Sequence, residues 1–220
     1  MARPEGTESV RVLGITGGIA SGKSRVTEAF RQLGAATLSA DDLAREIVLP
    51  GSPVLGQLRE RFGPRILAAD GSLDREALAV VIFGDEEARR DLNAIMHPAI
   101  AQLAQAHLER LRHTQAPLVV YEAPLLFEVG AERRVDAVLV VKVAPQVQLC
   151  RLMARDGLDE TAARLRIAAQ MPQEDKLARA DYVIDNSGSP AQTQVQVRDL
   201  FRKLTTSAAG RDQPESLPSG

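Results

Sequence analysis

The residues best suited to chemistry form one short segment near the start of the chain. Residues 17–24 read Gly-Gly-Ile-Ala-Ser-Gly-Lys-Ser, a full match to the phosphate-binding pattern G-x-x-x-x-G-K-[ST]. Its glycines let the backbone bend around an anion with N–H groups turned inward, and the helix that follows adds the positive end of its dipole. Lys23 offers a charge to the β- and γ-phosphate oxygens, and Ser24 offers Mg²⁺ a hydroxyl ligand. We therefore predict that Mg²⁺ binds at Ser24 and that ATP binds at Gly17, Gly18, Ile19, Ala20, Ser21, Gly22, Lys23, Ser24 and Arg25.

The segments on either side of this pattern decide between a phosphate site and a glycine turn that only caps a helix. Residues 10–16 are short, apolar and β-branched, as in a buried parallel strand. From Lys23 onward, apolar residues recur at spacings of three and four until Gly34, where a helix C-terminal glycine belongs. A strand before and a helix after are the context that the phosphate-binding pattern requires, so the phosphate site is favoured.

Strand and helix patterns alternate along the chain, except in one helical block. Further strand patterns occur at residues 35–38, 117–122, 135–143 and 182–185. Together with the first strand they predict an α/β fold with a mostly parallel five-stranded sheet covered by helices on both faces. Residues 41–115 instead show helical segments separated by Pro and Gly turns and by a break at His97-Pro98, which indicates an inserted helical lobe. The predicted core comprises residues 10–40, 116–144 and 181–204, with a flexible N-terminus at 1–9 and a disordered tail at 205–220.

The composition excludes several classes of partner. The chain has 27 basic and 29 acidic residues, 3% aromatic residues and no Trp, so it lacks the basic field and the stacking surfaces of nucleic-acid binders. No apolar run reaches the length of a membrane span, and we expect no membrane partner and a cytoplasmic protein. Cys150 is the only cysteine, which rules out an intrachain disulfide and predicts a small buried hydrophobic residue there.

Residues outside the phosphate site favour a kinase of small molecules over other nucleotide-binding proteins. No N-K-x-D guanine-binding motif is present, which argues against a GTPase switch. The strand at 117–122 ends in one acid, Glu122, whereas motor ATPases commonly have paired acids there. Glu122 is therefore a candidate ligand of the metal or of a water molecule.

Three further side chains are candidates for the transfer step. Asp41 follows the second predicted strand, where a carboxylate could orient an acceptor hydroxyl and take its proton; the alternative for the pair Asp41-Asp42 is capping of the next helix. Arg151 and Arg155 are four residues apart on a predicted helix, so both project from one face. They could neutralise charge on the migrating phosphoryl group, or they could form a solvated helix face.

Several stretches far from the phosphate-binding pattern carry a family resemblance. They are LSADDLARE (38–46), PGSPVL (50–55), DGSLDREAL (70–78), His97-Pro98, EAPLLFE (122–128), RLMARDGL (151–158), RIAAQM (166–171) and ADYVIDNSG (180–188). On these stretches, residues 10–203 resemble the dephospho-coenzyme A kinases.

The resemblance implies a P-loop kinase fold with a nucleotide-binding sheet, a helical lobe at 41–115 for the coenzyme A precursor and a helical lid at 145–180. It implies transfer of the ATP γ-phosphoryl group to the ribose 3′-hydroxyl of dephospho-coenzyme A with Mg²⁺, the last step of coenzyme A synthesis. A monomer or weak homo-oligomer is expected. The alternatives are a nucleoside or nucleotide kinase of related architecture and a non-catalytic nucleotide sensor.

The resemblance also assigns roles to individual residues. The implied catalytic residues are Lys23, Asp41 and Arg151. Contacts with ATP are implied for Arg155 and for Asn186, which would lie near the adenine. Asp41, His97 and Glu122 serve substrate binding, and a histidine at a helix end is the alternative for His97. Three positions depart from the family pattern: Ser39 and Glu122 stand where an aspartate is usual, and Arg25 stands where a threonine is usual.

Overall fold

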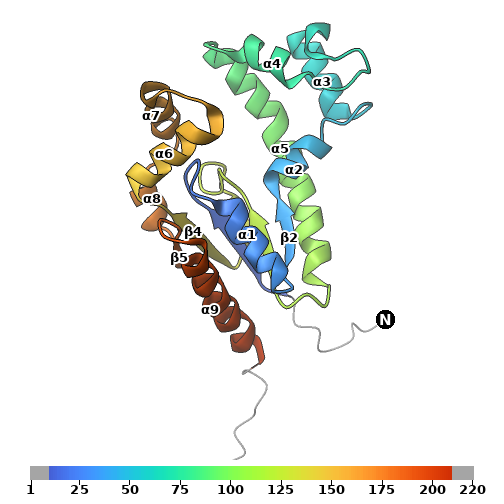
Figure 1. Ribbon diagram of the computed structural model, residues 1–220. Helices are drawn as coiled ribbons and strands as arrows, with labels where there is room; N and C mark the ends of the chain where they lie inside the picture. The colour runs from blue at the N-terminus through green and yellow to red at the C-terminus, as the bar shows by residue number, and fades with distance from the viewer. Residues whose placement is uncertain (1–9, 210–220) are drawn as a thin grey trace, which may run out of the picture. The chain divides into compact units, whose positions relative to one another are not determined.

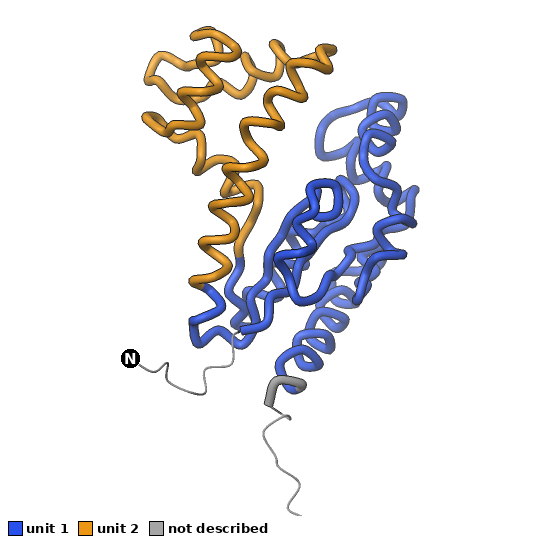
Figure 2. The backbone as a smooth tube through the Cα atoms, turned by 180° about the vertical axis from the view of Figure 1, so that it is seen from behind, with its two compact units in different colours: residues 1–37, 111–220 blue, residues 38–110 orange. Residues whose placement is uncertain are grey.

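The computed structural model describes residues 10–209, and the chain divides into two compact units (Figure 2). Unit 1 holds the described residues up to Thr37 and from Leu111 onward, and unit 2 holds residues 38–110. The predicted flexible N-terminus, residues 1–9, lies outside the described residues, as does most of the predicted disordered tail. Residues 205–209 of that tail are the last residues of a helix.

Unit 1 is built on a five-stranded sheet, as predicted (Figure 1). The strands are β1 (Val12–Thr16), β2 (Ala36–Ser39), β3 (Val119–Glu122), β4 (Ala137–Lys142) and β5 (Tyr182–Asp185). The last two residues of β2 are counted in unit 2. Their order is β2-β3-β1-β4-β5, and β1 pairs in parallel with both β3 and β4. Every residue of β1 and β3 is buried, which fits the continuous apolar runs of a sheet covered on both faces.

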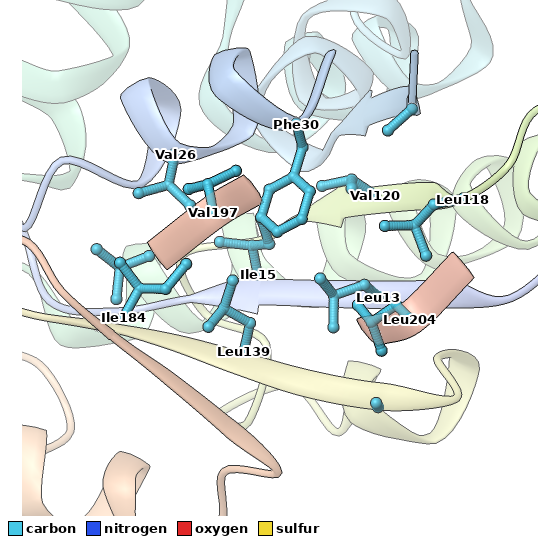
Figure 3. Close-up of a cluster of buried hydrophobic side chains, with 13 residues drawn as sticks. Leu13, Ile15, Val26, Phe30, Leu118, Val120, Leu139, Ile184, Val197 and Leu204 are labelled. Carbon is cyan, nitrogen blue, oxygen red and sulfur yellow. The ribbon is translucent and has the colours of Figure 1, made fainter. Parts of the chain in front are cut away.

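Two helices pack an apolar core onto one face of this sheet. They are α1 (Lys23–Gln32) and α9 (Pro190–Ala209). Figure 3 shows Phe30 pointing from α1 toward Ile15 of β1, with Val197 of α9 beside it. Phe30 and Ile15 are fully buried, and this packing fixes where α1 begins relative to the end of β1.

Within the described residues of unit 1, three further helices follow β4, and one short 3-10 turn precedes it. They are α6 (Pro145–Asp156), α7 (Glu160–Ala168), α8 (Gln173–Leu177) and a 3-10 turn at Ala131–Arg134. The helices α6 and α7 share a small apolar core of Leu149, Leu152 and Ala163. These helices occupy the region predicted as a lid.

Unit 2 is mainly helical and spans residues 38–110, whereas the sequence predicts a helical lobe at 41–115. It contains α2 (Ala40–Glu46), α3 (Pro53–Phe62), a 3-10 turn (Pro64–Ile66), α4 (Arg75–Ile82) and most of α5 (Glu86–Arg112). Ser52 caps α3 by accepting a hydrogen bond from the Leu55 N–H, and Asp74 caps α4 in the same way from Ala77. Unit 2 has its own hydrophobic core, in which Leu58 and Ile66 are fully buried.

The predicted break at His97-Pro98 is wrong, because α5 continues through both residues. A proline inside a helix removes one backbone hydrogen bond and costs about 3 kcal/mol. Apolar residues on both sides of it, Ile95, Met96 and Ile100, pack against the core of unit 2. Burial of these side chains offsets the cost and keeps the helix continuous.

Two other sequence-based expectations can be judged from the described residues. Cys150 is exposed, so the prediction of a buried residue is wrong: it lies on the side of α6 opposite to the face that holds Leu149 and Leu152. None of the helices within residues 10–209 is long and apolar enough to cross a membrane.

A bidentate ion pair fastens the beginning of the sheet to the end of α5. Arg112 donates through Nη1 and Nη2 to the two carboxylate oxygens of Asp136 at 2.8 and 2.9 Å, and the Val12 N–H donates to Asp136 Oδ2 at 2.6 Å. Burial raises the pKa of Asp136, but the hydrogen bonds from Arg112 and Val12 outweigh it and hold this pKa below its usual value. The carboxylate therefore stabilises the fold only while it is ionised.

We predict a pH-dependent stability from this pair. Because the folded-state pKa is lowered, the contribution is present above the unfolded pKa of about 3.9 and is lost as pH falls through the folded value. Asp136→Asn should lower the free energy of unfolding by about 1 kcal/mol at neutral pH, since the pair is partly exposed. Chemical denaturation between pH 7 and pH 3 should show this difference shrinking toward acid pH.

Asp199→Asn, on the exposed side of α9, is the matched control for loss of one carboxylate. Its stability at neutral pH should stay close to that of the unsubstituted chain. A difference between Asp136→Asn and the unsubstituted chain that does not change with pH would contradict the assignment.

Candidate nucleotide-binding site

The phosphate-binding pattern forms a loop between the carboxyl end of β1 and the start of α1. Gly22, immediately before α1, has φ 87°, in the left-handed region that favours glycine. A Cβ at Gly17 would lie 2.5 Å from the Val141 carbonyl oxygen, and one at Gly22 would meet the Asn186 amide. Gly22 is thus needed for the turn, and both glycines are needed for the close approach of Val141 and Asn186 to the loop.

Lys23 folds back over this loop. Its Nζ donates to the carbonyl oxygens of Gly17 and Gly18 at 3.1 and 3.0 Å, and the residue is only 8% exposed. The ammonium group therefore places its charge beside the loop and the positive end of the α1 dipole. This is a suitable arrangement for a polyphosphate.

Ser24 and Glu122 meet beyond the carboxyl ends of the strands, although they are far apart in the sequence. The Ser24 Oγ–H donates to Glu122 Oε1 at 2.8 Å, and Glu122 is buried at the end of β3. Oxygen donors of this kind fit Mg²⁺, which holds few protein ligands and shares the oxygens of bound phosphates. Within residues 10–209 no group of three or more His, Cys, Asp or Glu side chains could hold a metal by itself.

Asn186, after β5, supports the loop from outside. Its Nδ2 donates to the Ser21 carbonyl oxygen at 2.7 Å, and its Oδ1 accepts from Thr193 Oγ1 at 2.8 Å. Both ends of the side-chain amide are engaged, and the residue is buried. The contact with adenine predicted for Asn186 stays a prediction.

Two neighbouring cavities, of about 470 and 480 Å³, adjoin the loop. Both have the size of a pocket for a small-molecule ligand. One runs along α1 to Gln32 and to the first residues of α9, and the other passes over the loop to Ala154 of α6. Their shared lining residues are Ser24, Arg25, Arg151 and Asn186.

The two predicted arginines differ in their surroundings. Arg151 is half-buried and faces both cavities, so it is not simply part of a solvated helix face. Arg155 lines one cavity and donates to Asp156 at 2.7 and 3.1 Å, and Arg166 of α7 donates to the same carboxylate at 2.8 Å. The hydrogen bond from Arg155, with the charges of both arginines, lowers the pKa of Asp156.

Asp41 and His97 belong to unit 2. The alternative that Asp41 or Asp42 caps α2 is wrong, because Ser39 is the cap and its Oγ accepts from the Asp42 N–H at 3.3 Å. Asp41 lies exposed in the first turn of α2, and His97 lies half-buried in the middle of α5. Their roles toward an acceptor stay predictions.

Some residues of the site are not among those predicted. Gln148 of α6 and Gln170, after α7, both hydrogen-bond the backbone of Ile19. Lys176 is fully buried and donates to Glu128 at 2.7 Å and to the Pro124 carbonyl at 3.1 Å, which fixes the segment after β3. Only Gln148 could have been found from the sequence: it lies three residues before Arg151 and hence on the same helix face.

Comparison with known proteins gives a consistent result. A family model described as dephospho-CoA kinase matches residues 11–192. The dephospho-CoA kinase of Syntrophotalea carbinolica is 57% identical over 209 residues, which are 95% of this chain and 99% of that protein.

Two solved structures are similar over nearly the same length. TT1252 from Thermus thermophilus aligns with a TM-score of 0.74 at 36% identity, covering 90% of this chain and 99% of its own. The dephospho-CoA kinase from Campylobacter jejuni aligns with a TM-score of 0.65 at 27% identity, covering 89% and 98%. Because the family model spans most of the chain and these similarities extend along both partners, the chain belongs to the dephospho-CoA kinase family.

Proposed function

We propose that the protein transfers the γ-phosphoryl group of ATP to the ribose 3′-hydroxyl of dephospho-coenzyme A, which yields coenzyme A and ADP. The observation that carries the proposal is the 57% identity, over almost the entire chain, with a relative of that name. The phosphate loop with its buried Lys23 supports the ATP half of the reaction. The location in the cytoplasm and a monomeric or weakly associating state are parts of the same proposal.

The nucleotide half of the mechanism uses unit 1. The loop N–H groups, the α1 dipole and Lys23 bind the β- and γ-phosphates, while Arg25, Arg155 and Asn186 line the cavities that receive the rest of ATP. Ser24 and Glu122 would hold Mg²⁺, which when bound neutralises charge on the phosphate oxygens.

The acceptor half uses Asp41. Its carboxylate orients the 3′-hydroxyl and accepts the proton as the ribose oxygen bonds to the γ-phosphorus and the bond to the β-γ bridging oxygen breaks. Arg151 stabilises the negative charge that spreads over the migrating group. His97 and Glu122 contribute to substrate binding in this proposal.

A labelled transfer assay tests the function directly. The full chain with Mg²⁺ and γ-labelled ATP should pass label to dephospho-coenzyme A and not to coenzyme A, whose 3′-oxygen already carries a phosphate. Faster labelling of a nucleoside or nucleotide would favour the related kinase. ATP binding without any labelled product would favour the sensor.

Asp41→Asn should keep its affinity for ATP and lose most of its turnover, by about a hundredfold or more, because the amide cannot accept the acceptor proton. Steady-state kinetics and ATP titration separate the two effects. Asp42→Asn is the matched control, since Asp42 pairs with Arg45 on the exposed side of α2. Equal rates for the two variants would remove Asp41 from the mechanism.

Arg151→Ala should lower kcat by about a hundredfold and change the KM for ATP much less, because its charge matters most in the transition state. The control is Arg164→Ala, which loses an exposed ion pair with Glu160 on α7. A loss confined to KM would show that Arg151 acts in ground-state binding instead.

A further inference from the structure

The tip of the phosphate loop is part of the core of the helix pair α6–α7. Ile19 and Ala20 pack against the apolar cluster of Leu149, Leu152 and Ala163. The helix α6 also carries Arg151, which lines both cavities beside the loop. The loop and this arginine are therefore joined through side-chain packing as well as through the chain.

Two glutamines bind the backbone of Ile19 in opposite senses. Gln148 Nε2 donates to the Ile19 carbonyl oxygen at 2.8 Å, and Gln170 Oε1 accepts from the Ile19 N–H at 2.6 Å. These directions are forced, because a carbonyl only accepts and a backbone N–H only donates. Gln148 is 8% exposed, so water cannot readily replace its hydrogen bond.

The neighbours of Ile19 show why this residue needs to be held. A Cβ at Gly18 would lie 2.6 Å from Gln148 Nε2, so glycine leaves the space that the glutamine fills. Ala20 has φ 57°, the left-handed region, and it is the one non-glycine residue with positive φ in the part of the chain that the structure describes. Such a conformation persists where the surroundings hold it in place.

We propose that Gln148 and Gln170 are positioning residues for phosphoryl transfer: together they fix the Ile19 peptide groups, keep the phosphate loop in its ATP-binding shape and align it with Arg151. Gln148 and Arg151 are three residues apart on α6 and lie on the same face, so one helix carries both the support and the charge. The part that concerns transfer rests on the proposed function, whereas the part that concerns ATP binding does not.

A pair of charge-matched variants tests the two bonds. Gln170→Glu keeps an acceptor for the Ile19 N–H, whereas Gln148→Glu replaces a donor with an acceptor that faces the Ile19 carbonyl. Both variants add one negative charge beside the same residue, so their difference isolates the hydrogen bond. The affinity for a nonhydrolysable ATP analogue, measured by calorimetry, should be about tenfold weaker in Gln148→Glu than in Gln170→Glu.

Gln146→Glu is the control for the added charge on α6, because Gln146 is exposed on that helix and lines neither cavity. It should bind the analogue like the unsubstituted chain. Equal affinities in Gln148→Glu and Gln170→Glu would overturn the proposal.

Hydrogen exchange keeps the test decisive if Gln148→Glu does not fold. In Gln170→Met, the Ile19 amide should exchange faster than in the unsubstituted chain, and the KM for ATP should rise while the KM for dephospho-coenzyme A does not. Unchanged exchange and unchanged KM for ATP would show that the bond is incidental. If the unsubstituted chain binds the analogue but fails to phosphorylate dephospho-coenzyme A, the proposed function fails, and the analogue and exchange measurements still decide the role of the glutamines.

Discussion

A loop that receives an anion on its backbone N–H groups must leave those groups without protein partners, although unpaired backbone groups weaken a folded structure. In the loop between β1 and α1, side chains bond several of the other backbone groups and so help to hold the shape of the loop. Asn186 donates a hydrogen bond to the Ser21 carbonyl oxygen, and Lys23 donates to those of Gly17 and Gly18. Two glutamines bond the N–H and the carbonyl oxygen of Ile19. These side chains come from α1, α6 and the segments after β5 and α7, so distant parts of unit 1 contribute to the shape of the loop.

The parallel sheet brings these supports to one edge. Strand β1 lies between β3 and β4, and β5 follows β4, so the carboxyl ends of all four strands meet beside the loop. Glu122 and Asn186 each stand at or just after such an end. A binding site at this edge is the usual consequence of helices that leave neighbouring strands toward opposite faces.

Features that depend on neighbouring residues could be predicted from the sequence, and features that depend on distant packing could not. The strand before the loop, the helix after it and the role of the glycines follow from patterns within residues 10–34. The bonds from Gln148 and Gln170 join Ile19 to residues 129 and 151 positions away, and no spacing rule reaches that far. Likewise, Pro98 predicts a helix end locally, but the apolar side chains around it have a core to pack on and the helix continues.

Ser39 is a departure from the family pattern whose effect on local structure can be seen directly. An aspartate is usual at this position in the family pattern, and the serine here caps α2 through its hydroxyl oxygen, a task that both side chains perform. The substitution therefore keeps the start of the helix that carries Asp41.

The exposed position of Cys150 has a practical consequence for measuring motion. It is the sole thiol of the chain, and it precedes Arg151 on α6. A maleimide dye or a nitroxide would attach at this one place, without any background of other thiols. The natural sequence therefore already contains a reporter position on the helix whose Arg151 lines the two cavities beside the phosphate loop.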